Sequence, residues 1–234
     1  MIEQAIVESL HRAQKGSKQE IQAKALKAVL EAVKADGFQD IPPQQTPKET
    51  APVEVKRFSD EAREALTKEG YVIYTLTGGS IRSQRETGRK FWSTWHKDSQ
   101  YEAFETQGSM HSEVAIKPDA LFIPNSNNKI LKQQENLVGK FSKDLGKKVK
   151  GVEAIMGEAP DYVELAFAHL DATGDRLFGE KYGYNYARTK TPTVGPSVAV
   201  VGRFGAVAGL DVDDWDRGDG YGDVFASPLV VPKS

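Results

Sequence analysis

The sequence predicts an α+β fold: a mixed or largely antiparallel sheet packed by three to four helices, preceded by an N-terminal helical hairpin and a proline-rich tether. Helix and strand patterns alternate through the middle of the chain, and strand then follows strand, with tight glycine turns, in the last quarter. We therefore divide the chain into a helical arm (1–37), a linker (38–57) and an α+β domain (58–234).

Composition and charge exclude several classes of protein. The 234 residues include 31 basic and 33 acidic side chains, a formal net charge of −2, so nucleic acid is not an expected partner. The chain has no cysteine, which excludes disulfides, thiolate zinc sites and cysteine nucleophiles. Neither a signal-peptide pattern nor an apolar run of membrane-spanning length is present, so we expect a cytoplasmic protein without a membrane span.

The arm reads as two helices. The first has apolar residues at helical spacing and ends at Lys15-Gly16, and Ser17 with Glu20 forms a capping box for the second. The second helix ends at Gly37. Its apolar stripe comprises Ile21, Ala25, Leu26, Val29, Leu30 and Val33. A hairpin this small does not bury such a stripe by itself, so we expect the stripe to dock on the main domain, on a second copy or on a partner. The candidate partner-binding residues on the arm are Ile21, Leu26, Val29, Leu30 and Val33, and those on the domain are Tyr182, Tyr184 and Tyr186.

The linker is rich in proline. Four prolines lie among glutamine, threonine, lysine and glutamate between residues 38 and 56, a composition typical of an extended, polyproline-like tether.

The first half of the domain is predicted to contain short helices and strands in alternation. Ser59 opens a helix that ends near Gly70, and residues 71–77 are β-branched and aromatic, as in a strand. The glycines before Ser80 turn into a helix, and a weak strand follows at 113–116. The residues assigned to that helix are Ile81, Arg82, Arg85, Arg89, Phe91, Trp92 and Trp95.

The second half begins with a helix from about Lys129 that Gly146 is expected to stop. A strand at 152–156 precedes a helix that starts at Pro160, with Asp161 and Glu164 near its positive end, and closes at Gly174. The last quarter contains predicted strands at 182–190, 197–204, 206–212 and 224–231.

The acidic stretch, residues 211–223, is the candidate metal site. It does not match an EF-hand, because Trp215 stands at the fifth position, no glutamate closes the loop and flanking helices are missing. A looser oxygen cage for Ca²⁺ or Mg²⁺ would use Asp211, Asp213, Asp216 and Asp219. The alternative is a solvated hairpin loop whose glycines supply positive φ angles.

The turn after the strand at 71–77 is the candidate anion site. Backbone amides near Gly79 would point at an anion, and Arg82 and Arg85 would add charged donors. The spacing matches neither the phosphate-loop nor the dinucleotide fingerprint, and Ser80 acting as a plain helix cap explains the turn without a ligand.

Aromatic residues supply two further candidate surfaces. Tryptophans beside arginines in residues 89–96 would stack bases or sugars, although their helical spacing favours core packing. Tyr182, Tyr184 and Tyr186 alternate along a predicted strand. They would form a surface that binds flat ligands, a surface for self-association, or a half-buried face of the sheet.

The histidines show no catalytic pattern. His169 and Asp171 are two residues apart on a helix and do not face each other, whereas His111 and Glu113 share one face of a strand. No nucleophile is tied to either pair by a local motif, so we assign no catalytic residue.

These observations favour a non-enzymatic binding or assembly protein, such as a component of a larger particle or complex, with a protein partner or a second copy docked on the arm. The alternative is a metal-dependent enzyme acting on a phosphorylated or anionic small substrate. That alternative requires the strand at 71–77 and the acidic stretch to lie at the same end of one sheet. A third interpretation, carbohydrate or nucleobase stacking, requires exposed rings at Trp92, Trp95 or Tyr184.

Overall fold

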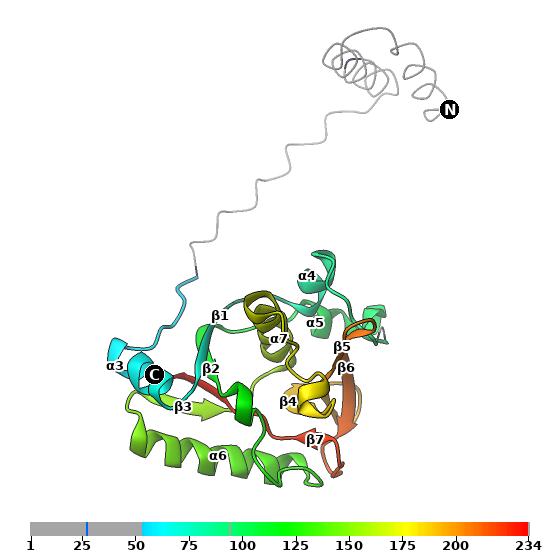
Figure 1. The fold of residues 1–234 in the computed structure, drawn as a ribbon. Helices are drawn as coiled ribbons and strands as arrows, with labels where there is room; N and C mark the ends of the chain where they lie inside the picture. Colours follow the sequence, from blue (N-terminus) through cyan, green and yellow to red (C-terminus); the bar gives the residue numbers. More distant parts are fainter. Residues whose placement is uncertain (1–26, 28–52, 94, 234) are drawn as a thin grey trace, which may run out of the picture. The chain divides into compact units, whose positions relative to one another are not determined.

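The computed structural model describes residue 27, residues 53–93 and residues 95–233. Within it, Val53–Ser234 forms one compact unit, shown in Figure 1. The predicted hairpin, its apolar stripe and residues 38–52 of the tether lie outside the described residues, apart from the helical Lys27. The rest of the tether, residues 53–57, is described, and Lys56 forms an isolated bridge with Ser112.

Five α-helices belong to this unit. They are α3 (Asp60–Lys68), α4 (Ile81–Glu86), α5 (Glu102–Thr106), α6 (Leu131–Lys148) and α7 (Ala159–Thr173). Short 3₁₀ helices lie at η1 (Trp95–Lys97), η2 (Ser99–Tyr101), η3 (Pro118–Ala120) and η4 (Glu180–Tyr182). Among these described helices, none is both long and apolar enough to cross a bilayer.

The first sheet has the strand order β1-β2-β8-β3, and all its pairings are antiparallel. Its strands are β1 (Val72–Thr77), β2 (His111–Ile116), β3 (Val152–Ile155) and β8 (Leu229–Pro232). β1 and β2 pair along their whole length, from Val72 opposite Ile116 to Thr77 opposite His111.

The second sheet has the order β6-β5-β4-β7, and only the short β7 runs parallel to its neighbour, β4. Its strands are β4 (Tyr186–Pro192), β5 (Ser197–Gly205), β6 (Gly209–Asp216) and β7 (Val224–Phe225). The α+β class and its largely antiparallel pairing are confirmed, but the strands form two sheets and not one. The predicted strand at 224–231 is in fact two strands in different sheets.

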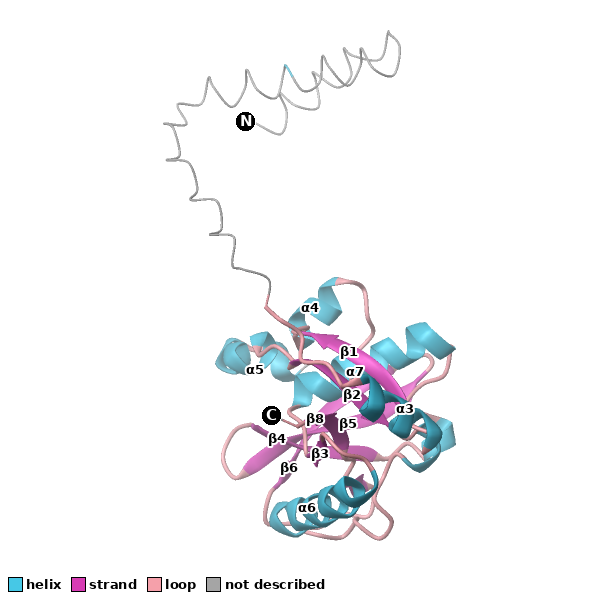
Figure 2. Ribbon diagram, turned by 90° about the vertical axis from the view of Figure 1, so that its left-hand side faces the viewer, coloured by secondary structure: helices cyan, strands magenta, loops and turns pink. Residues whose placement is uncertain are grey.

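Helix α7 lies in the main core and contacts strands of both sheets (Figures 1 and 2). Most of its side chains are buried, because apolar residues surround the helix instead of forming one stripe. Tyr162, Leu165 and Phe167 of α7 pack in the same cluster as Leu76 of β1 and Val201 of β5. Each such buried side chain contributes roughly 2 kcal/mol.

The other face of the first sheet is covered by α3 and α6, because successive residues of each strand point to opposite faces. Val114 and Ile116 of β2 pack in the main core, whereas Ala115 between them packs in a second cluster. That cluster is formed by Phe58, Ala62, Leu66, Tyr71, Ala115, Leu145, Val149, Val152, Ala154 and Val230.

The predicted ends of the long helices are only partly right. Gly174 ends the helix at 159–173 in the left-handed conformation (φ 78°), as expected. Gly146, however, does not stop α6, which continues to Lys148. A glycine is tolerated inside a helix when neighbouring packing holds it, and the adjacent Leu145 is buried.

The predicted helix through residues 81–95 is wrong beyond its first turns. Helix α4 ends at Glu86, and Gly88 then adopts a positive φ of 88°. Phe91 forms an isolated bridge with Leu210, so backbone pairing with β6 replaces the helix. Trp92 is 57% exposed and not packed inward.

The predicted strand at 182–190 begins only at Tyr186. Tyr182 ends the 3₁₀ helix η4, and Gly183 and Tyr184 follow with positive φ angles of 66° and 54°. The alternation of Tyr182, Tyr184 and Tyr186 along one strand is therefore wrong, since a glycine turn interrupts it.

The acidic stretch is also placed differently from the predicted loop. Strand β6 extends through Asp216, so the first six residues of the stretch pair with β5. The loop proper comprises only residues 217–223. Charged side chains on an edge strand are a common means of preventing further strand pairing.

Candidate functional site

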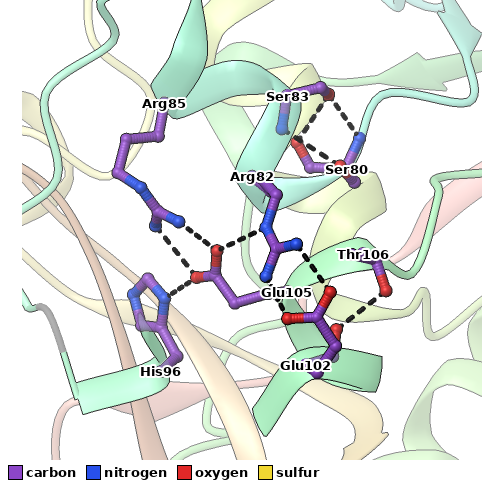
Figure 3. Close-up of polar contacts among 8 residues, drawn as sticks. All are labelled: Ser80, Arg82, Ser83, Arg85, His96, Glu102, Glu105 and Thr106. Carbon is purple, nitrogen blue, oxygen red and sulfur yellow. Dashed lines mark hydrogen bonds and ion pairs between the residues drawn. The ribbon is translucent and has the colours of Figure 1, made fainter. Parts of the chain in front are cut away.

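The turn from β1 into α4 carries the predicted anion-binding residues. Ser80 caps α4: its Oγ accepts a hydrogen bond from the N–H of Ser83 (3.1 Å), and the Ser83 hydroxyl accepts one from the N–H of Ser80 (2.8 Å; Figure 3). This reciprocal cap satisfies two backbone donors without a ligand.

Glu164 of α7 occupies the turn. Its carboxylate accepts hydrogen bonds from the N–H of Gly79 (3.0 Å), the N–H of Thr77 (3.0 Å) and the hydroxyl of Thr77 (2.8 Å). The hydroxyl of Ser109 donates to the same carboxylate. The amide of Gly79 thus binds an internal anion, as the sequence predicts for a ligand.

Gly79 has little room for a side chain beside this carboxylate. A Cβ at that position would lie 3.1 Å from the Glu164 carboxyl group and 2.7 Å from the amide nitrogen of Gln84. A larger residue at this position would therefore require the side chains of Gln84 and Glu164 to move.

The two arginines of the predicted anion site are also held by carboxylates (Figure 3). Arg82 donates to Glu102 (Nη1 to Oε1, 2.6 Å), and Arg85 donates to the fully buried Glu105 (Nη1 to Oε1, 2.9 Å). Both pairs are bidentate, the geometry in which guanidinium and carboxylate match best. The structure therefore brings Arg82 and Arg85 together, with their charges already balanced.

His96 completes this network from the segment before α5. Its Nδ1 is hydrogen-bonded to Glu105, and its ring packs against Phe91, Trp95 and Phe104. Burial lowers the pKa of His96, so the neutral imidazole donates from Nδ1. Its Nε2 is an acceptor that is buried with no hydrogen-bond partner among the described residues, which costs free energy but leaves no unpaired charge.

Glu105 is the anion of the network. Burial alone would raise its pKa, but the hydrogen bonds from Arg85 and His96 prevail and hold the pKa below its ordinary value. Sequence reasoning missed His96, Glu105 and Glu164, because no local motif links them. Glu164 was assigned only to the helix dipole.

The acids beside the two histidines pair with arginines, although His111 and Glu113 do share strand β2. His169 and Asp171 point to different partners, as expected: Tyr74 lies 2.5 Å from Nδ1 of His169, and Asp171 binds Arg89. Glu113, which shares a strand with His111, accepts hydrogen bonds from Arg63 and from the N–H of Phe58 instead.

Asp211 and Asp216, two of the candidate metal ligands, already have hydrogen-bond partners nearby. The carboxylate of Asp211 accepts hydrogen bonds from Tyr186 (2.6 Å) and Ser93, and that of Asp216 accepts one from the N–H of Gly218 (2.6 Å). Across residues 53–93 and 95–233, no group of three or more histidine, cysteine, aspartate or glutamate side chains is arranged to hold a metal ion. A cation at Asp211, Asp213, Asp216 and Asp219 thus stays a prediction from sequence. In addition, β1 and β6 belong to different sheets, so the arrangement that the enzyme alternative requires is not present.

The rings proposed for stacking differ in exposure. Trp92 and Tyr184 are exposed, whereas Trp95 is half-buried and packs against Tyr101 and Phe104. Tyr184 borders a cavity of about 230 Å³ between the segment that follows α7 and the end of β5.

Two further cavities open on the domain. A groove of about 440 Å³ runs between residues 53–56 and the strands β2, β3 and β8. The α6 pocket, of about 280 Å³, is lined by Glu69, Tyr71, Lys117, Ala120, Leu121, Phe141, Asp144, Leu145, Lys148 and Pro228. Its floor is mainly apolar and its rim is charged.

Comparisons with protein-family models, with curated proteins and with solved structures find no significant match. The functional argument therefore depends on the geometry of this chain.

Proposed function

We propose that the chain is a non-enzymatic binding or assembly protein. The arm would dock a partner or a second copy through its apolar stripe, and the folded domain would present a fixed surface. The proposal is supported chiefly by one observation: Glu164 binds the same backbone amide that an anionic substrate would need.

Chemistry on an anionic substrate needs donors that are free to bind it. Here the amide of Gly79 and the hydroxyl of Ser109 donate to Glu164, and Arg82 and Arg85 donate to carboxylates. Displacing Glu164 would leave a buried charge without partners, which costs several kcal/mol. The network is therefore better suited to fixing the positions of β1, α4, α5 and α7 than to turnover.

The arm supplies the docking element of this proposal. Its stripe repeats at helical spacing and includes Ile21, Leu26 and Val33. Apolar residues in such a stripe contribute to stability only when another surface covers them.

The test is the mass of the full-length chain by light scattering on a sizing column. Leu26→Asp with Leu30→Asp places two charges in the stripe, and the matched control Lys27→Glu changes a neighbouring exposed residue. We expect a defined oligomer for the parent chain and for the control, and a monomer for the double variant, since burying unpaired carboxylates is costly.

An unchanged mass in the double variant would contradict the docking role of the arm. If millimolar Ca²⁺ or Mg²⁺ also raised the melting temperature, a cation site on the folded domain would become the leading interpretation.

A further inference from the structure

The α6 pocket has an apolar floor beneath a charged rim. Tyr71, Phe141 and Leu145 contribute to the floor, and Lys117 and Lys148 lie at the rim. The rim also includes Glu69 and Asp144, which pair with Lys148 (3.8 Å) and Lys147 (2.6 Å). Lys117 stands 5.6 Å from the ring centroid of Tyr71, over its face.

The lining of this pocket carries two lysines and two acids, but the C-terminal half of α6, which forms one wall of the pocket, is rich in lysine. Within residues 140–150 there are five lysines and one aspartate, a net charge of +4 in a chain whose total is −2. All five lysines are exposed: Lys140, Lys143, Lys147, Lys148 and Lys150. An occupant of the pocket should therefore combine an apolar group with negative charge.

Such a combination occurs on the same domain, in residues 217–223, here called the Tyr221 loop. Tyr221 is 42% exposed, rests on Trp215 with ring centroids 4.2 Å apart, and has Asp219 and Asp223 two residues away on either side. The Asp219 side chain is exposed and interacts electrostatically with the buried Arg188, whereas Asp223 pairs with Arg203 (3.3 Å).

The Tyr221 loop and the α6 pocket lie at different ends of α6. The loop is attached at the N-terminal end, where the N–H of Leu131 donates to the carbonyl of Arg217 and the N–H of Asn128 to that of Tyr221 (both 2.9 Å). The pocket begins ten residues further along, at Phe141, about 15 Å along the helix axis. In Figure 1, α6 runs along the lower side of the domain, with β7 near one end and α3 near the other.

We propose that the α6 pocket binds the Tyr221 loop of a second copy of this chain. The aromatic ring of Tyr221 enters the apolar floor, and Asp219 faces the lysines of the rim. Tyrosine suits this role because it buries a large apolar surface and keeps a hydroxyl for the polar rim. The inference rests on the proposed assembly function and names a contact for it.

Contacts of this type join two different surfaces, so each copy keeps one free pocket and one free loop. The association is head-to-tail and forms a closed ring or an open chain, depending on the rotation between copies. Charge pairing at the rim also makes the association sensitive to salt, because exposed charges are screened beyond about 10 Å at 0.1 M ionic strength.

The test uses the full-length chain carrying Leu26→Asp and Leu30→Asp, so that the arm does not contribute. In this background, we expect concentration-dependent association at low salt. Lys117→Glu with Lys148→Glu, or Asp219→Lys with Tyr221→Ser, should each weaken the association about tenfold or more. Lys97→Glu, an exposed lysine away from both surfaces, serves as the matched control.

Crosslinking tests the contact independently of affinity. Because the chain has no cysteine, single substitutions give a clean background. A mixture of Lys117→Cys and Asp219→Cys chains should form a disulfide-linked dimer under mild oxidation, whereas Lys97→Cys with Asp219→Cys should not.

The self-association and crosslinking experiments together test the contact between the α6 pocket and the Tyr221 loop. A monomer at every concentration, or equal crosslinking by both cysteine pairs, overturns it. If the lysine substitutions weaken binding to a single-stranded DNA oligonucleotide but leave self-association unchanged, a polyanion is the occupant and the inference also fails. Assembly of the parent chain through the arm would then survive as a separate result.

Discussion

Glu164 serves as an internal ligand in this structure. Its carboxylate gathers donors from the end of β1, from the turn into α4 and from Ser109 before β2. A single side chain thus ties α7 to segments about 55 and 85 residues away in the sequence.

Glu164→Gln tests this role. The amide would direct N–H donors at groups that themselves donate, so the free energy of unfolding should fall by about 3 kcal/mol. Urea denaturation measures the change, and Glu180→Gln, at an exposed glutamate, serves as the control. Equal stability of the two variants would show that the Glu164 network contributes little.

Buried histidines make stability depend on pH. Burial lowers the pKa of both His96 and His169. In the unfolded chain an imidazole takes up its proton near pH 6.5 (about the free value), but in the folded chain only at lower pH. The unfolded state therefore binds more protons below that pH, and stability falls as the pH falls.

We expect the free energy of unfolding to decrease from pH 7 towards pH 5, with a slope of up to about 1.4 kcal/mol per pH unit for each histidine. Glu105 and Glu113, whose pKa values are also lowered, extend the loss to more acidic pH, whereas the raised pKa of Asp161 acts in the opposite direction. His96→Asn keeps a neutral donor beside Glu105 and should reduce the slope. An unchanged slope would mean that His96 does not titrate in this range.

Glycines have opposite roles in different elements. Gly209 begins β6 with φ 96°, and a Cβ there would lie 2.3 Å from the carbonyl oxygen of Lys90. Gly139 in α6 is exposed, and nothing lies within 4 Å of a Cβ placed on it.

Gly209→Ala should therefore lower the free energy of unfolding by about 3 kcal/mol, through backbone strain and the clash. Gly139→Ala should raise it by about 0.5 to 1 kcal/mol, because alanine loses less backbone entropy in a helix. Thermal or urea unfolding of the two variants provides a matched comparison. The same sign for both would contradict these environments.

Across the whole molecule, sequence patterns predicted the positions of helices and strands better than they predicted contacts between distant residues. The pattern at 71–77 identified β1, and Pro160 with Gly174 bracketed α7, because strand composition and helix ends are local properties. The helix through Trp95 was wrong because pairing between Phe91 and Leu210 is a contact over more than a hundred residues.

At the polar site, too, the sequence identified neighbouring residues but not their distant partners. Gly79, Ser80, Arg82 and Arg85 were identified together because they are adjacent in sequence. Their partners were not, since Glu102, Glu105 and Glu164 reach them only after the chain has folded. A glycine next to a helix cap signals a close approach, but not which group approaches.

The position of β8 in the first sheet affects how this domain is made in the cell. β8 follows every other strand in the sequence, yet it lies between β2 and β3 and pairs with both. During translation, β2 and β3 therefore leave the ribosome well before the strand that joins them. Until β8 is synthesised, the nascent chain exposes two unpaired strand edges over the apolar surfaces beneath α3, α6 and α7, which are conditions under which chaperones engage nascent chains.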